Sequence, residues 1–378
     1  MEKVTNKAFA VNDTAYDAQN PLIIAELGTS HGADPAKARD LVDAAAKAGA
    51  NCVKFQMVYA HEILHPKTGA VKLPGGMIPL YDTFKKLESA VQFFADIKDY
   101  AEKRGLIFLC TPFGPRSASE IAALNPLLFK IASPELNYTS LLKQVAGFQL
   151  PVLLSSGVSR LGDIEEALEL FKPPGGRDNP ERICLLHCVT SYPAPETDYN
   201  LRVLRSLSAI FGTPVGVSDH SADPELVPVL AAAMGAAVIE KHFCLSRQDP
   251  GLDDPIALPP EDFARMTAAL RRTGGLGAEA MVEALARERG PALVEAVLGS
   301  GVKALAPSEK ANYLRTNRSI HALRDIEAGE VITADMTGIL RTEKILRPGL
   351  PPSWAEKIAG RRARQVIPAG EGIRFEDI

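Results

Sequence analysis

This chain of 378 residues has no large excess of charge of either sign. It contains 42 Lys and Arg and 46 Asp and Glu, which gives a formal net charge of -4. Such a balance provides no basic field for nucleic acid, so any cationic site must be local. No apolar run approaches transmembrane length, and residues 1–20 are mixed and polar, without the apolar region of a signal peptide. We therefore expect a cytoplasmic protein with neither a membrane nor a nucleic-acid partner.

Cysteine pairs and dinucleotide-binding glycine motifs are also lacking. Each of the five cysteines lies in or beside an apolar run, which is typical of buried small side chains in a reducing compartment: Cys52, Cys110, Cys184, Cys188 and Cys244. No GxGxxG follows the first apolar run, which argues against a dinucleotide-binding fold. With 46% hydrophobic and 23% charged residues, the composition indicates an ordinary soluble globular protein with one large domain and a smaller one.

What the chain does contain is a regular alternation of short apolar runs and helical patterns. In residues 35–48 the apolar side chains recur at helical spacing, with Asp34 suited to cap the helix and Gly49 to end it. Eight apolar runs of strand length alternate with such patterns: 22–25, 52–56, 106–111, 127–132, 152–155, 183–187, 215–220 and 238–243. Strict alternation with eight strands predicts an α/β fold, a (β/α)8 TIM barrel, rather than an open Rossmann sheet.

The remaining segments have a different texture. Residues 57–82 are broken by Pro and Gly and predict an inserted loop, and residues 87–104 predict a helix. A helical connector is expected over 279–298. Beyond it, residues 326–332 match 367–373 in five of seven places, which predicts a small β-rich domain with pseudo-symmetry. We expect a barrel over 1–275, a linker over 276–312 and the β-rich domain over 313–378.

Polar residues follow the strand candidates at the point where each one ends. Since the carboxyl ends of parallel strands share one rim, we expect these side chains to face one another: Glu26, Lys54, Gln56, Thr111, Lys130, Ser133, Glu135, Ser155, His187, Ser218, His220, Glu240 and His242. Two lysines with several hydroxyls would form an anion pocket, and His220 and His242 could hold a divalent metal. A single lysine at the end of a strand is more often a surface group, and a single histidine is more often a hydrogen-bonded core residue. Polar residues at the ends of all eight strands favour a functional site instead.

Histidines elsewhere are interpreted as solvated, namely His31, His61, His65 and His321. Trp354 is interpreted as a packing anchor of the small domain.

Taken in order, the strand-end motifs resemble those of the sialic-acid synthases. The resemblance rests on Ile24-Ala25-Glu26-Leu27-Gly28, Val53-Lys54-Phe55-Gln56, Thr111-Pro112-Phe113, Lys130-Ile131-Ala132-Ser133, Leu154-Ser155-Ser156-Gly157, Leu186-His187-Cys188, Ser218-Asp219-His220 and Glu240-Lys241-His242-Phe243. In the tail, Arg318-Ser319-Ile320 and Ala328-Gly329-Glu330 resemble the antifreeze-like (SAF, β-clip) domain of that family.

The resemblance implies condensation of phosphoenolpyruvate with an N-acetylated aminohexose, usually N-acetylmannosamine, to a nine-carbon 2-keto sugar acid. It assigns catalysis to Glu26, Glu135, Lys54 and Lys130, with Glu26 or Glu135 transferring the proton. It assigns substrate binding to Gln56, Thr111, Ser133, Ser155, Thr190, Tyr192, Ser218, Asp253 and Arg318. It implies a divalent metal ion at His220 and His242, either Mn2+, Mg2+ or Co2+. Arg318 would reach into the barrel of the other subunit, which implies a domain-swapped homodimer.

Departures from the family pattern leave the sugar open. Thr190 stands where Asn or Ser is usual, Asn317 replaces one of two arginines, and residues 251–255 keep only Asp253 of the usual motif. Synthases of legionaminic or pseudaminic acid share the scaffold. Three further alternatives are a synthase that uses a sugar phosphate such as arabinose 5-phosphate, a Schiff-base lyase with Lys130 as nucleophile, and a sugar- or ice-binding module based on the tail.

Overall fold

Eight parallel strands form the barrel that the alternation predicts. The computed structural model describes residues 7–73, 76–172, 182–343 and 345–378. The barrel strands are β3 (Leu22–Gly28), β4 (Cys52–Met57), β7 (Ile107–Pro112), β8 (Phe129–Ile131), β9 (Val152–Ser155), β10 (Ile183–Cys188), β11 (Val215–Asp219) and β12 (Ala236–His242). Hydrogen-bonded neighbours run in the order β7-β4-β3-β12-β11-β10-β9-β8. Because β7 and β8 also contact each other, the sheet nearly closes into a ring.

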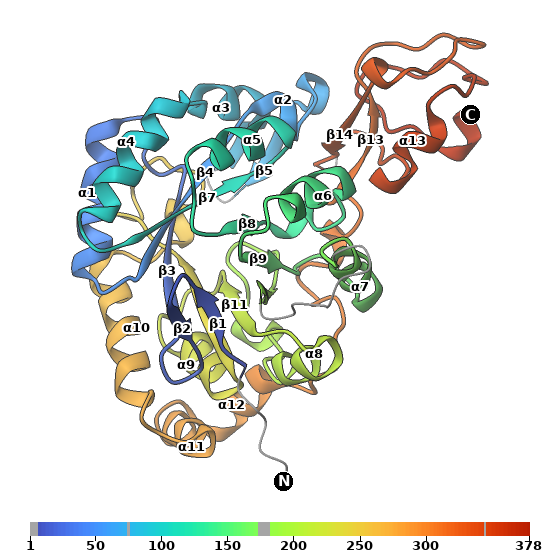
Figure 1. Ribbon diagram of the computed structural model, residues 1–378. Helices are drawn as coiled ribbons and strands as arrows, with labels where there is room; N and C mark the ends of the chain where they lie inside the picture. The colour runs from blue at the N-terminus through green and yellow to red at the C-terminus, as the bar shows by residue number, and fades with distance from the viewer. Residues whose placement is uncertain (1–6, 74–75, 173–181, 344) are drawn as a thin grey trace.

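Helices cover the outside of this ring (Figure 1). They are α1 (Pro35–Lys47), α4 (Val91–Glu102), α5 (Pro115–Ala123), α6 (Thr139–Gly147), α7 (Leu161–Glu169), α8 (Val203–Phe211), α9 (Leu226–Ala233) and α10 (Pro260–Thr273). Helix α1 shows how the local sequence specifies a helix. The Asp34 side chain caps it by accepting a hydrogen bond from the Ala36 amide at 2.8 Å, and the predicted apolar face is buried. Gly49 follows with φ +93°, a conformation that suits glycine. The main apolar core fills the space between helices and strands.

The amino-terminal segment forms a hairpin that the sequence did not reveal. Strands β1 (Phe9–Val11) and β2 (Thr14–Tyr16) pair antiparallel. Phe9, Val11 and Tyr16 are buried in a second core, with side chains from the beginnings of the barrel strands such as Leu22 and Cys52. The hairpin therefore closes the end of the barrel opposite to the carboxyl ends of the strands. Strands of three residues are too short to show the period-2 alternation that predicts a strand.

The segment expected as an inserted loop has regular structure. It contains α2 (Ala60–Ile63), η1 (Pro66–Thr68), the hairpin of β5 (Ala70–Leu73) and β6 (Gly76–Pro79), and α3 (Leu80–Leu87). The helix expected over 87–104 begins later, at Val91, because the chain is extended at Ala90. We call residues 58–87 the insertion.

The connector between the barrel and the tail is two helices rather than one. Helices α11 (Ala278–Arg289) and α12 (Pro291–Leu298) meet at Gly290, since proline cannot continue a helix. Met281, Leu285 and Val297 join the barrel core, so both helices pack on the barrel. Among the described helices, none combines the length and the apolar character that crossing a bilayer requires.

The tail has an apolar core of its own, with β13 (Arg318–Ala322) and β14 (Thr337–Arg341) paired antiparallel. Short helical turns complete the chain: η2 (Ser133–Glu135), η4 (Glu196–Asp198), η5 (Asp254–Ile256), η6 (Lys310–Asn312), η7 (Ala334–Met336), η8 (Pro352–Trp354), α13 (Ala355–Ile358) and η9 (Phe375–Asp377). The two halves of the near-repeat face each other, because Ile326 and Ile367 exchange backbone hydrogen bonds of 3.0 and 2.9 Å. Gly329 and Gly370 share positive φ values of +84° and +92°, and Trp354 packs edge-on against Phe375 as predicted for an anchor.

Candidate active site

The carboxyl ends of β4, β8 and β12 bring two buried lysines to one carboxylate. Lys54 Nζ lies 2.9 Å from Glu26 Oε2 and 3.0 Å from Glu240 Oε1. Lys130 Nζ lies 3.6 Å from the same Glu240 oxygen. The strand register explains this, since Glu26 pairs with Lys54 across β3 and β4 and their side chains point to the same face. All four side chains are at least 95% buried, so the cluster sits inside the barrel.

The two carboxylates and the two lysines of this cluster differ in the direction of their pKa shifts. Burial raises the pKa of Glu26. The Lys54 ammonium lowers that pKa and the Glu240 carboxylate raises it, and the net shift is upward. Burial would also raise the pKa of Glu240, but Lys130 and Lys54 outweigh it and bring that pKa down to about 2. For Lys54, the two carboxylates overcome burial and raise the pKa, whereas burial lowers the pKa of Lys130. Glu240 is therefore the fixed anion, and Glu26 is the carboxylate that accepts a proton more readily.

Hydroxyl groups surround the lysines. Ser155 accepts from Lys130 Nζ at 2.8 Å, and Ser218 donates to Glu240 at 2.8 Å. Thr111 Oγ1, Thr190 Oγ1 and Glu240 Oε2 are buried without a hydrogen-bond partner among the described residues. Buried polar atoms are costly when unpaired, so these atoms mark where the polar groups of a ligand or water would fit.

Ser133 and Thr190 approach each other across Gly157. Ser133 Oγ accepts from the Gly157 amide at 3.0 Å, and a Cβ on Gly157 would collide with both side chains. A glycine is therefore required for this part of the rim to close around the hydroxyls.

His220 and His242 lie side by side at the ends of β11 and β12, with ring centroids 5.3 Å apart. Two imidazoles that share a cation at a metal–nitrogen distance of about 2.0–2.1 Å, at a near-tetrahedral angle, have centroids roughly 5 Å apart. His220 Nδ1 lies 2.9 Å from the Val189 carbonyl, to which it can donate, leaving Nε2 for a metal. Burial, with His220 adjacent, lowers the pKa of His242 and favours its neutral, ligating form, whereas Cys188 outweighs burial at His220 and raises the pKa of that ring. The pair thus fits the expected divalent metal.

Other metal-binding side chains near the pair are less well placed. Asp253 Oδ2 lies 3.9 Å from His242 Nδ1, and Cys188 Sγ lies 3.8 and 3.9 Å from the two ring nitrogens of His220. Within the described ranges, no group of three His, Cys, Asp or Glu side chains is arranged to hold a metal ion. A cation at the two histidines would therefore take its remaining ligands from water or substrate.

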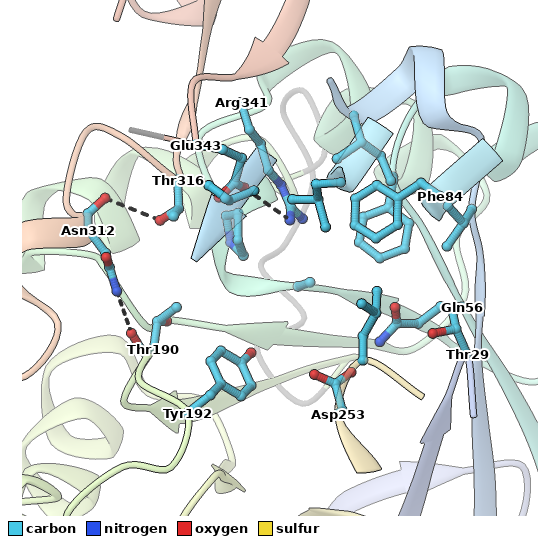
Figure 2. Close-up of a pocket in the computed structure, with 18 of the residues that line it drawn as sticks. Thr29, Gln56, Phe84, Thr190, Tyr192, Asp253, Asn312, Thr316, Arg341 and Glu343 are labelled. Carbon is cyan, nitrogen blue, oxygen red and sulfur yellow. Dashed lines mark hydrogen bonds and ion pairs between the residues drawn. The ribbon is translucent and has the colours of Figure 1, made fainter. Parts of the chain in front are cut away.

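A cavity of about 600 Å3 opens beside the histidines. Of the predicted binding residues, Gln56, Thr190, Tyr192 and Asp253 line it. Tyr192 stacks on His220 with centroids 4.3 Å apart, so the cavity and the metal pair are contiguous. Figure 2 shows Tyr192 and Asp253 along one wall and Arg341 across from them. We call this cavity the chamber.

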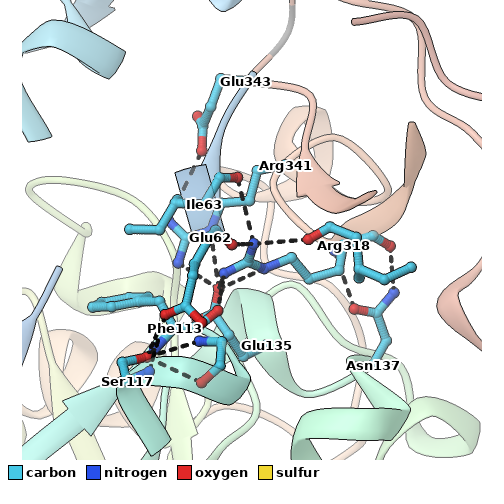
Figure 3. A network of polar contacts seen from close by, with 11 residues as sticks. Glu62, Ile63, Phe113, Ser117, Glu135, Asn137, Arg318, Arg341 and Glu343 are labelled. Atoms are coloured by element: carbon cyan, nitrogen blue, oxygen red, sulfur yellow. Dashed lines mark hydrogen bonds and ion pairs between the residues drawn. The ribbon is translucent and has the colours of Figure 1, made fainter. Parts of the chain in front are cut away.

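Glu135 and Arg318 are paired with each other and do not line the chamber. Arg318 Nε donates to Glu135 Oε1 at 3.0 Å, and Arg341 Nη2 donates to the same oxygen at 2.6 Å (Figure 3). The Arg318 guanidinium also donates to the carbonyls of Glu62 and Phe113 at 2.5 and 2.7 Å. These contacts join the tail to the barrel of the same chain, whereas the resemblance implied the barrel of the other subunit.

Three histidines expected to be solvated are buried, so that prediction was wrong for His31, His65 and His321. His31 stacks on Phe93, and His321 lies in the core of the tail between Ser319 and the Gly370 carbonyl. Only His61 of this group is exposed. A position on a loop or in a small domain does not determine burial, which depends on what packs over it. The five cysteines are free and buried, as predicted.

Two residues at the site escaped the sequence reasoning. Arg341 gave no signal because it lies in the tail, 206 positions from Glu135. Glu309 follows the predicted turn at Pro307 and Ser308, and its carboxylate accepts from the amides of Val158 and Thr190, each at 2.9 Å. A carboxylate just after a predicted turn is not distinctive. Glu240 was placed at the rim but given no role.

Comparison with known proteins settles the family. Residues 41–279 match the NeuB family, and residues 317–378 match the SAF domain. The chain belongs to the NeuB family. The spore coat polysaccharide biosynthesis protein SpsE of Bacillus subtilis is 33% identical over 98% of this chain and 97% of its own length. Its crystal structure is similar with a TM-score of 0.80, covering 98% of this chain and 99% of that one.

Other relatives of this NeuB-family chain carry named activities. The N,N'-diacetyllegionaminic acid synthase of Legionella pneumophila is 31% identical over 94% of both chains. The N-acetylneuraminic acid (sialic acid) synthetase of Leptospira borgpetersenii, solved with citrate, is 29% identical, has a TM-score of 0.63 and covers 81% of this chain and 95% of its own. The resemblance to the sialic-acid synthases and the SAF character of the tail are thus confirmed, and the chain is an enzyme of a sugar-acid synthase family.

Proposed function

We propose that this protein condenses phosphoenolpyruvate with an N-acetylated aminohexose, N-acetylmannosamine or a related sugar, to give a nine-carbon 2-keto sugar acid and phosphate in a metal-dependent reaction. The observation that carries the proposal is the buried cluster of Lys54, Lys130 and Glu240 directly inside a two-histidine pair that opens into a chamber. Two lysines and unpaired hydroxyls suit a small dianion. The chamber suits a sugar.

Each end of phosphoenolpyruvate has candidate partners in the cluster. The phosphate and carboxylate would be held by the two lysines together with hydroxyls at the strand ends: Thr111, Ser133, Ser155 and Ser218. This grip directs C3 toward the chamber, where the new carbon–carbon bond forms with the aldehyde carbon. Water then adds at C2 and phosphate leaves. A divalent cation bound at His220 and His242 would polarise the aldehyde.

Glu26 is the better candidate for the proton transfer. Burial raises its pKa, and Gln56 donates to its second oxygen at 2.6 Å at the border of the chamber. It can therefore hold a proton and pass it to the aldehyde oxygen as that oxygen becomes a hydroxyl. Glu135 is instead held in place by ion pairs with Arg318 and Arg341, and it does not line the chamber.

For the whole protein we propose a cytoplasmic homodimer with barrel 1–275, linker 276–312 and tail 313–378, in which the tails are exchanged between subunits. Exchange replaces contacts within a chain by the same contacts between chains. The pairing of Arg318 with Glu135 is a contact that exchange would preserve. The irregular stretch between α12 and η6 provides the necessary hinge.

The test is phosphate release from phosphoenolpyruvate in the presence of Mn2+ and a panel of N-acetylated hexoses, with arabinose 5-phosphate as the alternative acceptor. We expect release that requires an N-acetylated hexose and is abolished by a chelator or by His220→Ala or His242→Ala, with the circular dichroism spectrum unchanged. Release with arabinose 5-phosphate alone, or full activity in both histidine variants, would overturn the proposal.

The lowered pKa of Lys130 is the one observation that favours a Schiff-base lyase, because a neutral amine is the nucleophile in that chemistry. Borohydride reduction in the presence of pyruvate separates the two functions. Labelling of Lys130 would support the lyase, whereas the condensing enzyme remains unlabelled.

A further inference from the structure

The segment between barrel and tail carries a buried carboxylate that is bonded to the rim of the barrel. Glu309 is 1% exposed, and its Oε2 atom accepts from the amides of Val158 and Thr190, each at 2.9 Å. Its other oxygen accepts from the Ala306 amide at 3.1 Å. Glu309 therefore joins this segment to two loops, one after β9 and one after β10.

Two asparagines that follow Glu309 hold the carbonyls of the same two loop residues. Asn312 Nδ2 donates to the Thr190 carbonyl at 2.9 Å, a contact drawn in Figure 2. Asn317 Nδ2 donates to the Val158 carbonyl at 3.1 Å. The backbone N–H and C=O groups of both loop residues are thus fixed by side chains from the same short segment. We call Glu309, Asn312 and Asn317 the clamp.

Val158 has a backbone conformation that needs such support. Its φ is +43°, in the left-handed region that is unfavourable for a β-branched side chain. A residue remains in this region only where the surrounding contacts hold it there. The contacts on the two sides of Val158 are those of Glu309 and Asn317, so the clamp determines the conformation of the loop after β9.

The clamped loops carry hydroxyl groups of the anion site. Gly157 directly precedes Val158, and its amide donates to Ser133 Oγ at 3.0 Å. Thr190 Oγ1 is buried without a hydrogen-bond partner among the described residues. Because Gly157 fits closely between the Ser133 and Thr190 side chains, a movement of its loop displaces both hydroxyls.

We propose that the clamp positions the loops after β9 and β10 for phosphoenolpyruvate, so that the Ser133 and Thr190 hydroxyls are already in place when the anion binds. The inference rests on the proposed function and adds positioning residues to the phosphoenolpyruvate end of the site. Phosphoenolpyruvate binds the fraction of molecules whose loops are correctly placed, so its apparent Kd rises as that fraction falls.

The experiment measures the Kd of phosphoenolpyruvate by isothermal titration calorimetry on the full chain, with Mn2+ and without a sugar. Glu309→Gln keeps the shape of the side chain, but its amide group cannot accept from all three backbone amides. We expect the Kd to rise at least about 10-fold, with the circular dichroism spectrum unchanged.

The matched control is Asp198→Asn. Asp198 accepts from the amide of Ser308, the residue before Glu309, at 2.9 Å, and it is not part of the clamp. Its substitution should leave the Kd within about 2-fold of the wild-type value.

A second substitution separates positioning from a general loss of structure. Glycine adopts a positive φ without strain, so Val158→Gly makes the required loop conformation accessible without the clamp. In the Glu309→Gln background it should lower the Kd again by at least about 3-fold, although removing a fully buried side chain lowers stability. A merely structural role of Glu309 predicts the opposite, because the second substitution would add to the damage.

The outcomes distinguish this inference from the proposed function. Failure of the wild type to bind phosphoenolpyruvate would overturn both. Binding by the wild type that is unchanged in Glu309→Gln, equally weakened in Asp198→Asn, or not restored by Val158→Gly would overturn the clamp alone. If Glu309→Gln does not fold, Asn317→Ala carries the same expectation through the Val158 carbonyl, and an unchanged Kd in that variant would overturn the clamp.

Discussion

At the scale of single residues, Glu240 is the charge on which the anion site depends. Its carboxylate lies 3.6 Å from Lys130 Nζ and 3.0 Å from Lys54 Nζ, so it neutralises charge on both lysines. We expect Glu240→Gln to lower the free energy of unfolding by about 3–5 kcal/mol, because removing one partner leaves buried charge uncompensated. Urea unfolding followed by circular dichroism measures this.

The matched control is another paired glutamate at the surface. Glu283 forms an ion pair with Arg287, and their side chains are 67% and 79% exposed. Glu283→Gln should change the free energy of unfolding by less than about 1 kcal/mol. Equal effects of the two substitutions would contradict the assignment of Glu240 as a buried counter-charge.

A buried histidine of the tail should make stability depend on pH. Burial lowers the pKa of His321 from 6.5 to about 4, because its ring is enclosed in the core of the tail, and this outweighs the hydrogen bond to the Gly370 carbonyl, which raises the pKa. A depressed pKa means that the unfolded chain binds the proton more tightly, so stability is complete above pH 6.5 and is lost as the pH falls toward 4. The loss amounts to about 3 kcal/mol for His321.

The measurement is the free energy of unfolding between pH 7.5 and 4 for wild type and His321→Gln. We expect the variant to lose less stability over this range by about 3 kcal/mol, whatever its stability at pH 7.5. His61→Gln, at an exposed position, should follow the wild-type curve. Parallel curves for wild type and His321→Gln would refute the effect of burial.

Prediction from sequence worked for residues whose position follows from a strand. Lys54, Lys130, Ser218 and Glu240 lie together because parallel register brings strand ends to one rim, which the order of apolar runs already specifies. The pairing of Glu135 with Arg341 was beyond reach, since it joins residues 206 positions apart in separate cores. Burial of His31 and His321 depends on tertiary packing in the same way.

At the scale of elements, the amino-terminal hairpin contributes to stability more than its length suggests. Phe9 is fully buried among the first residues of the barrel strands. We expect Phe9→Ala to lower the free energy of unfolding by about 3–5 kcal/mol through loss of buried surface and the cavity left behind. Thr14→Ala, at an exposed position of the same hairpin, should change it by less than about 0.5 kcal/mol. Similar values for both would show that the hairpin does not close the barrel in solution.

Elements were predictable where their pattern was long. The amphipathic face of α1 and its capping residue were correctly predicted, because thirteen residues hold several helical periods. The hairpin β1–β2 and the strands of the insertion were not, because three or four residues show too little periodicity. The insertion supplies most of the apolar side chains that line the chamber, so this wall was the part of the site that the sequence left undescribed.

At the scale of the whole molecule, the repeated alternation of strand and helix was enough to predict a closed barrel, and the near-repeat of the tail was enough to predict a second, pseudo-symmetric unit. The resemblance implied that Arg318 joins the tail to a barrel, but its pairing with Glu135 and the second arginine, Arg341, on the same carboxylate were not predicted. The same contact can be made within a chain or between two chains, and activity can distinguish them.

Differently tagged Lys130→Met and Arg318→Met chains, co-expressed and purified through both tags, provide the test. If tails are exchanged, one of the two sites in this heterodimer combines an intact barrel with an intact tail, so we expect about half of the wild-type activity. If each tail serves its own barrel, every site lacks one of the two residues and the heterodimer is inactive.

A chain with both substitutions, paired with wild type, gives the reverse result: no activity with exchange and about half without it. Because the two pairings carry the same substitutions in equal number, a difference between them can only come from which chain supplies Arg318 to Glu135, and failure to recover any double-tagged species would overturn the homodimer itself.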